Sequence, residues 1–216
     1  DKIITHHGPY YINLNAKEDD KISASIKRVL DTARAGKDLG AYSITYHAAF
    51  YLGDDKKTLM KRMIERHQII IDTLKEEDNN IWIRPETTGK KSQWGELDEI
   101  IELSKHFSQI LPCIDFAHIH ARENGKFNTY DEFCHILEHL GEELGDIALN
   151  NFHGHVAGIK YTDKGEKNHL IFEESDFNYK DLLRAMKKFN IKGALTCESP
   201  NIEIDTKILK DYYLSL

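Results

Sequence analysis

The stretch AYSITYH at residues 41–47 and the stretch KKTLMKRMIERHQIIIDTLK at residues 56–75 decide the fold. β-Branched and aromatic side chains are frequent in the first, which is typical of a strand. The second carries Leu59, Met63, Ile70 and Ile71 at helical spacing, which predicts an amphipathic helix. A strand followed at once by a helix is the repeating unit of a parallel sheet.

The same order of strand and helix continues along the whole chain. The five other strand-like runs are Lys2–His6, Asn80–Ile83, Ile110–Ile114, Asn150–Gly154 and Gly193–Cys197. The other helical patterns are Ile22–Ala33 (closed by Gly36 and Gly40), Gly95–Phe107, a run that opens with the capping box Thr129-Tyr-Asp-Glu132, Tyr179–Phe189 and Ile204–Leu216. Strict alternation predicts a parallel sheet with right-handed crossovers.

Six βα units fit either an open doubly wound sheet or most of a (β/α)₈ barrel. An open sheet that binds nucleotides needs a glycine-rich phosphate loop after an early strand, and the sequence has none. We therefore expect an α/β fold, a TIM (β/α)₈ barrel with six of the eight βα units present and residues 1–216 in a single domain. The chain starts in a strand-like run without Met, so we expect it to be truncated at the N-terminus.

Length and composition narrow the class of protein. The 216 residues carry a net charge of −7, which argues against a nucleic-acid coat with a diffuse basic surface. It does not argue against a local nucleic-acid site that holds metal cations. No apolar run approaches the roughly 20 residues of a membrane span, so we expect no membrane partner. The three cysteines form no CxxC pair, which favours a reducing cytoplasm, and we expect a cytoplasmic monomer.

Every predicted strand end carries a residue type that binds metals, and in a barrel the functional groups collect at those ends. Each such residue alone is most often a helix cap or a hydrogen-bond partner. Several uncompensated polar groups at one barrel mouth would be costly without a cation, so we expect a metal site. The residues are His7, His47, Glu86, Asp115, His155 (or His153) and Glu198.

The ligand types indicate which metal and how many ions. Imidazole with carboxylate and no thiolate suits zinc, manganese or iron. One catalytic zinc usually needs only three protein ligands, so the larger set indicates more than one ion. Two ions about 3.5–4 Å apart are well suited to phosphodiester hydrolysis. His118, with Glu166 and His169 in a later loop, offers ligands for a separate third ion.

A competing motif lies at His135-Ile-Leu-Glu138-His139, which matches the HxxEH pattern of inverted zinc metallopeptidases. The apolar positions of its helix leave these three side chains towards solvent and far from the strand ends. We therefore reject the peptidase interpretation. His67 and His106 also fall within helical patterns, and we expect both at the surface or at the edge of the core.

Two aromatic residues, Tyr10 and Tyr11, follow His7 closely. On a loop beside a metal site, such residues can stack on bases or wedge into a duplex. Ordinary loop packing is the alternative, and the spacing alone favours it.

Seven motifs, in order, span nearly the whole chain: HGPYYINL at 7–14, YH at 46–47, RPETTG at 84–89, CIDFAH at 113–118, HVAGI at 155–159, GEKNHL at 165–170 and TCESP at 196–200. Together they resemble the endonuclease IV family of apurinic/apyrimidinic endonucleases, and most of all its archaeal-type branch. The resemblance implies a (β/α)₈ barrel with three zinc ions, or with manganese in their place. It implies hydrolysis of the phosphodiester 5′ to abasic sites in double-stranded DNA during base excision repair, leaving a 3′-hydroxyl.

The resemblance also implies residue roles. Glu86 is the catalytic carboxylate that bridges two zincs, and Tyr10, with Tyr11 beside it, matches the aromatic that enters the duplex. The implied ligand sets are His7, His47 and Glu86 for one zinc, Glu86, Asp115, His155 and Glu198 for the second, and His118, Glu166 and His169 for the third.

The chain departs from the family pattern in two places. The usual pair at the third site is Asp-x-His, whereas Glu166-Lys-Asn-His169 is one residue longer, a shift that the longer Glu side chain could absorb. Counting back from Glu166 favours His153 as the ligand on the fifth strand, whereas the local run HVAG favours His155, which we adopt. The chain also begins at what resembles the third strand of the family, so its first two βα units are absent.

Two other functions use the same residue types. A xylose-isomerase-like sugar isomerase or epimerase shares the barrel and its Glu, Asp and His ligands, usually with one or two divalent ions, and acts on free sugars. A non-catalytic homologue that binds abasic DNA would keep the barrel and lose the third metal. The number of histidines and the Tyr10-Tyr11 pair favour the nuclease.

Overall fold

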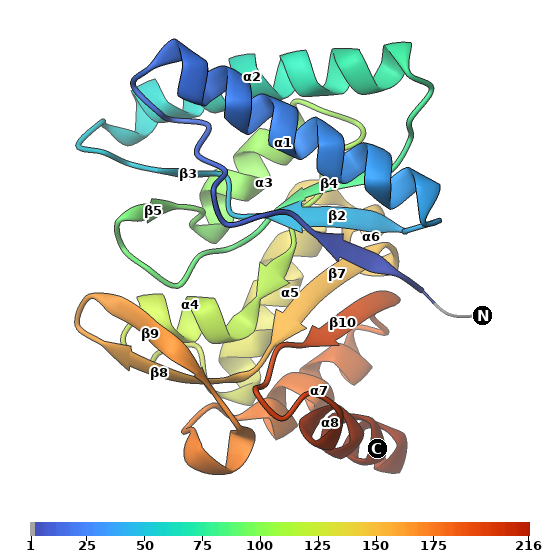
Figure 1. Ribbon diagram of the computed structural model, residues 1–216. Coiled ribbons are helices and arrows are strands. Elements are labelled where there is room, and N and C mark those ends of the chain that lie inside the picture. The colour runs from blue at the N-terminus through green and yellow to red at the C-terminus, as the bar shows by residue number, and fades with distance from the viewer. Residues whose placement is uncertain (1–2) are drawn as a thin grey trace. The chain divides into compact units, whose positions relative to one another are not determined.

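The computed structural model describes residues 3–216. These residues form two compact units, one of residues up to 86 together with 92–113, and one of residues 87–91 together with 114–216. Each unit contains a parallel sheet whose strands are connected through helices (Figure 1). The predicted alternation of strand and helix is therefore present in both units.

The first unit has a parallel sheet in the order β1-β2-β4, so the carboxyl ends of its strands share one edge. The strands β3 and β5 form a separate antiparallel pair. The elements of this unit are β1 (Thr5–His7), α1 (Asp19–Asp38), β2 (Ser43–Tyr46), β3 (Ala49–Phe50), α2 (Lys56–Glu76), β4 (Trp82–Pro85), β5 (Gln93–Trp94) and α3 (Leu97–Lys105).

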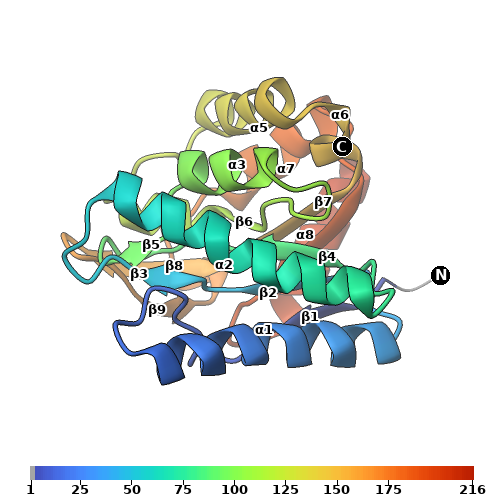
Figure 2. The same cartoon turned by 90° about the horizontal axis from the view of Figure 1, so that it is seen from above.

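The helices α1 and α2 lie side by side and bury their apolar faces with the sheet of the first unit (Figure 2). Val29 and Ala33 of α1, Met63 and Ile70 of α2, and Ile44 of β2 belong to one buried cluster. Full burial of an aliphatic side chain of this size contributes about 1.5–3 kcal/mol, so this cluster is a main source of stability for the strand ends.

His67 is wholly buried, so the prediction that it lies at the surface or core edge is wrong, whereas His106 is exposed as expected. Its Nδ1 lies 2.7 Å from the Met63 carbonyl oxygen, which can only accept, so Nδ1 of His67 carries the proton. Its Nε2 therefore accepts from the Tyr46 hydroxyl at 2.7 Å. Burial lowers the pKa of His67 to about 4.

The second unit has a parallel sheet in the order β10-β7-β6 and an antiparallel hairpin of β8 and β9. The predicted capping box is confirmed, because Glu132 N donates to Thr129 Oγ1 and Thr129 N donates to Glu132 Oε2. The elements are β6 (Ile114–Asp115), α4 (Phe116–Arg122), α5 (Tyr130–Leu144), α6 (Asp146–Asn150), β7 (Phe152–Val156), β8 (Gly158–Thr162), β9 (Gly165–Leu170), the 3₁₀ turn η1 (Phe172–Glu174), α7 (Tyr179–Lys188), β10 (Gly193–Cys197) and α8 (Glu203–Ser215).

Several predicted element bounds need correction. The run Ile110–Ile114 is not a continuous strand, since only isolated bridges form at Ile110 and Cys113 before β6 begins. Pro112 lies between the two bridges and has no N–H for a ladder hydrogen bond. The segment that carries Glu166 and His169, predicted as a loop, is strand β9. Among residues 3–216, no helix is long and apolar enough to cross a membrane.

Candidate metal centre

Three predicted ligands of the first unit meet at the carboxyl ends of its strands. His7 ends β1, His47 follows β2 and Glu86 follows β4. Glu86 Oε2 lies 3.0 Å from His7 Nε2 and 3.3 Å from His47 Nε2. The three ligand atoms lie within 4.8 Å of one another, close enough for one ion about 2 Å from each.

A hydrogen bond to the backbone determines which ring nitrogen of His7 is free of a proton and able to bind a metal ion. Its Nδ1 lies 2.6 Å from the Gly8 carbonyl oxygen, so we assign the ring proton of the neutral imidazole to Nδ1. The lone pair of Nε2 then points at the buried carboxylate of Glu86. At this distance the imidazole and the carboxylate need either a second ring proton, on Nε2, or a cation between them. The arrangement of the first unit therefore fits a metal ion.

A second group of ligands gathers in the other unit. Asp115 ends β6, His118 lies in the first turn of α4, and His169 lies on β9. Ligand atoms of these three residues also lie within 4.8 Å of one another. His118 Nε2 is 3.4 Å from His169 Nε2 and 3.6 Å from Glu166 Oε2.

The backbone orients both imidazoles of this second group. His118 Nδ1 lies 2.9 Å from the Thr87 carbonyl oxygen, and His169 Nδ1 lies 3.1 Å from that of Glu198. With the Nδ1 protons engaged there, both Nε2 atoms present lone pairs to each other. Carbonyl partners of this kind are usual for histidines that bind metals. Asp115 Oδ2 is buried and accepts no hydrogen bond, so this group also fits a cation.

A β-bulge brings Glu166 and His169 to the same cluster. Side chains three residues apart on a regular strand point to opposite faces. In the hairpin, Lys160 pairs with Asn168 while the next residue, Tyr161, pairs with Glu166, so Lys167 is an extra residue in β9. This bulge restores the common direction. The additional residue in Glu166-Lys-Asn-His169 is thus accommodated by the backbone and not, as we expected, by the longer Glu side chain.

Two glycines allow the segment 87–91 to approach this hairpin. Glu166 N donates to the Gly89 carbonyl oxygen at 2.8 Å. A Cβ atom on Gly89 would lie 2.6 Å from Glu166 Cβ, and one on Gly165, at φ +96°, would lie 2.2 Å from the Gly89 oxygen. Close approach therefore requires glycine at both positions.

Replacing Gly89 with Ala is expected to displace the Glu166 side chain and to weaken metal binding at the His118 cluster. The fold should be retained, because the added methyl group meets a side chain at the edge of the unit. Elemental analysis after dialysis should find about one ion fewer per chain than in the unmodified protein. Gly141→Ala is the matched control, since its Cβ would meet only the flexible Leu149 side chain. Equal metal content in the two variants would contradict this role of Gly89.

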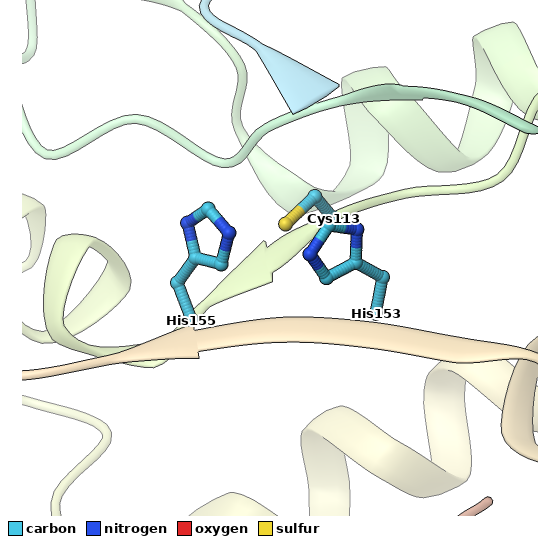
Figure 3. Close-up of side chains that lie close together, drawn as sticks. All are labelled: Cys113, His153 and His155. Carbon is cyan, nitrogen blue, oxygen red and sulfur yellow. The ribbon is translucent and has the colours of Figure 1, made fainter. Parts of the chain in front are cut away.

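His153 and His155 lie two residues apart on β7 and point to the same side of the strand (Figure 3). Their ring centroids are 5.1 Å apart. His155 is paired in register with Asp115, and its Nδ1 lies 3.3 Å from Glu198 Oε1. His155 thus stands beside two predicted ligands at the carboxyl end of the strand, and His153 lies one step further from that end.

Tyr10 and Tyr11 are each 81% exposed. The Tyr10 ring lies 5.7 Å from the His7 ring and 6.2 Å from the His47 ring. The ordinary loop packing that the spacing favoured is therefore not what these rings show. Tyr10 presents an exposed aromatic surface beside the ligands of the first unit.

One hydrogen-bond network, with His120 buried and Asp176 exposed, was missed in the sequence. His120 Nε2 lies 3.2 Å from Asp176 Oδ1, and the Tyr161 hydroxyl donates to Asp176 Oδ2 at 2.6 Å. The hydrogen bond to Asp176 is the main reason that the pKa of Tyr161 rises to about 12. The network ties α4, which carries His118, to the β8–β9 hairpin, which carries His169. The only sign of this network in the sequence was His120, two residues after His118.

Parallel βα units with clusters of histidine and carboxylate near their strand ends define an α/β protein with candidate sites for divalent metal ions. The sequence matches the family described as xylose isomerase-like TIM barrel over residues 2–212, and the chain belongs to that family. The predicted TIM barrel fold is therefore confirmed.

The sequence is similar to an uncharacterized protein and to proteins named as endonucleases. An uncharacterized protein of Methanocaldococcus jannaschii is 42% identical over 216 residues, which are 100% of this chain and 78% of that protein. A probable endonuclease 4 of Bacillus subtilis is 26% identical over 185 residues. That match covers 82% of this chain, and the chain spans 60% of the length of the relative.

Solved structures support the same fold. A D-tagatose 3-epimerase-like protein has a TM-score of 0.74 at 16% identity, with coverage of 97% of this chain and 76% of that chain. Endonuclease IV from Thermus thermophilus has a TM-score of 0.68 at 13% identity, with coverage of 98% and 76%. At such identities the likeness concerns the fold, which these enzymes use for different reactions.

Proposed function

We propose that this protein is a zinc-dependent endonuclease that hydrolyses the phosphodiester 5′ to abasic sites in double-stranded DNA and leaves a 3′-hydroxyl. The observation that carries the proposal is the set of paired imidazoles whose Nε2 lone pairs converge with carboxylates at the strand ends of each unit. The similarity to probable endonucleases in sequence supports it. Hydrolysis by more than one divalent ion is the chemistry that such ligand sets serve.

The proposed roles follow the clusters. Bound zinc supplies Lewis acidity and makes a hydroxide nucleophile available near neutral pH. The resemblance assigns Glu86 as the carboxylate that two of the ions share. By the same resemblance, the proposed ligand sets are His7, His47 and Glu86 for one ion, Glu86, Asp115, His155 and Glu198 for the second, and His118, Glu166 and His169 for the third.

Other groups of the protein orient the proposed imidazole ligands and offer a contact for the DNA. The carbonyl groups of Gly8, Thr87 and Glu198 hold the Nδ1 protons of three imidazoles, so that each Nε2 is presented in a fixed direction. Tyr10 offers a ring that can stack on the duplex beside a missing base. A lesion without a base needs no unstacking of that base, so turning its sugar outward costs less than flipping an intact nucleotide.

The test uses one purified preparation and two substrates. Protein prepared without chelator is assayed on a duplex that carries one tetrahydrofuran abasic analogue, and on free ketohexoses. We expect a single incision 5′ to the analogue and no epimerised sugar. Sugar turnover with an intact duplex would replace the proposal with the epimerase, whose fold neighbours include the D-tagatose 3-epimerase-like protein. Tight binding without incision would identify the non-catalytic homologue.

Metal content of the same preparation gives an independent test. We expect about three zincs per chain, one for each proposed ligand set. One or two manganese or magnesium ions would favour the isomerase, and two zincs would mean that the His118 cluster stays empty.

Tyr10→Ala is expected to reduce incision of abasic DNA without changing metal content. Loss of one stacked aromatic contact costs about 1–3 kcal/mol, or roughly 5- to 150-fold. Tyr11→Ala, equally exposed, tests whether the effect belongs to the ring beside His7 and His47. Incision at an unchanged rate in Tyr10→Ala would exclude a part for this ring in substrate binding.

A further inference from the structure

Helix α7 presents a row of cations to solvent. Lys180, Arg184, Lys187 and Lys188 are all exposed, and their spacing of four, three and one residues places them on one face of the helix. The opposite face is buried in the second unit through Leu182, Leu183, Ala185 and Met186. Packing therefore fixes the direction of the charged residues, which we call the α7 basic face.

Aromatic rings of α5 and α8 lie beneath these cations. Arg184 lies 5.0 Å and Lys188 5.8 Å from the centre of the Tyr130 ring. Lys187 lies 4.9 Å from the Tyr213 ring, and Lys180 lies 5.9 Å from the Tyr212 ring. Such contacts hold a cation in place through the electron-rich face of the ring and leave its full positive charge.

The lysines of the α7 basic face are not neutralised by carboxylates. Within residues 3–216, Lys180, Lys187 and Lys188 form no ion pair, and Arg184 alone pairs with Asp181, at 2.9 Å. Other helices follow a different pattern. Three lysines of α1, α2 and α8 pair with a carboxylate four residues on, in Lys27–Asp31, Lys61–Glu65 and Lys207–Asp211. In a chain of net charge −7, the three lysines of α7 that form no ion pair leave a local positive charge on this face.

The dimensions and the surface chemistry suit a phosphate backbone. From position 180 to position 188 the helix rises about 12 Å, which is the length along the DNA axis of about three to four base pairs at about 3.4 Å each. An open hollow lined by Tyr130, Arg184, Lys187, Lys188 and Leu216 lies along the face. A stable protein interface usually has an apolar centre, whereas the tyrosines here are partly buried beneath the charges.

We propose that the α7 basic face binds the sugar–phosphate backbone of nucleic acid, as a second contact surface besides the metal ligands. The contact is independent of sequence, because it involves point charges and phosphates and no base edges. The inference rests on α7 and its aromatic neighbours alone. It would stand if the chain cut no DNA, and a failure here would leave the proposed incision untouched.

The experiment measures the anisotropy of a fluorescein-labelled duplex without a lesion, titrated with the metal-loaded protein at several salt concentrations. In the triple variant Lys180→Gln, Lys187→Gln, Lys188→Gln, binding at about 0.1 M salt should weaken at least tenfold, by loss of up to three phosphate contacts. The slope of log K against log salt should decrease by about 2–3.

The matched control is Lys27→Gln, Lys61→Gln, Lys207→Gln, which removes the same charge from ion-paired lysines of other helices. It should bind like the unmodified protein, and Lys→Arg at the three α7 positions should retain binding. Equal affinity and slope in the two Gln triple variants would overturn the proposal. So would displacement of the duplex by polyglutamate as effectively as by unlabelled DNA at equal charge, which would indicate an acidic protein partner. Thermal melting of both variants verifies that these exposed substitutions leave the fold intact.

Discussion

Glu86→Gln is expected to abolish incision of abasic DNA while the fold is retained. The amide keeps the shape of the side chain but presents one oxygen in place of two and carries no negative charge. Mutation of a residue that only hydrogen-bonds to a metal ligand lowers activity or metal affinity by about 10- to 100-fold. Glu86 lies near both His7 and His47 and is a proposed ligand itself, so its replacement should lower the incision rate by more than about 100-fold. The measurement is the single-turnover incision rate on a duplex with one abasic analogue.

Glu65→Gln is the matched control for this experiment. Glu65 is a carboxylate on the exposed side of α2 in the same unit, and its replacement should leave the rate unchanged. Elemental analysis of Glu86→Gln should show fewer bound ions than the control. Turnover of Glu86→Gln within a few-fold of the control would rule out a ligand role for this carboxylate.

Acidification is expected to destabilise the protein through His67. In the folded chain, burial holds the pKa of His67 near 4, against an ordinary value of about 6.5. Between these values the unfolded state binds a proton that the folded state does not, so the free energy of unfolding falls as the pH falls from about 6.5 to about 4. A difference of about 2.5 pKa units corresponds to a loss of about 3 kcal/mol.

A double variant isolates this contribution from the other histidines. Tyr46→Phe with His67→Leu replaces both partners of the buried hydrogen bond by apolar side chains, which can be nearly neutral at pH 7. Urea unfolding at several pH values should show a drop for the unmodified protein that is about 3 kcal/mol larger than for the double variant. His106→Gln, at an exposed position, should follow the unmodified protein. If the free energy of unfolding falls with pH by the same amount in the double variant and in the unmodified protein, His67 is not the cause of the acid destabilisation.

The linear pattern of the sequence was enough for the long helices and for most strands of the parallel sheets, and it showed the candidate ligands by residue type. The apolar period of residues 56–75 corresponds to α2, and Gly193–Cys197 is the strand β10 as predicted. Local patterns succeed here because a helix or strand buries one face at a fixed spacing. The ligand types at the strand ends were equally visible, because parallel strands bring their carboxyl ends to one edge.

The predicted ends of the strands were less accurate, because hydrogen bonding with the neighbouring strand determines where a strand ends. β4 was predicted to end at Ile83 but continues to Pro85, since Tyr46 of β2 pairs with Pro85. The short helix α4 was missed because its seven residues are all buried and show no amphipathic period. Its start depends on Asp115, whose side chain accepts from His118 N at 2.7 Å.

The sequence by itself determined the α/β class, the order of strands and helices, and the residue types available to a metal. Tertiary structure alone decided which of those residues lie close together, which way their side chains point and how deeply they are buried. The bulge at Lys167, which turns Glu166 and His169 to one side, depends on the pairing of β9 with β8, and the burial of His67 depends on Tyr46 of β2. The rings beneath the α7 basic face come from α5 and α8. These contacts form by packing and hydrogen bonding between elements. They do not follow from the spacing of residues along one element, so they leave no periodic pattern in the sequence.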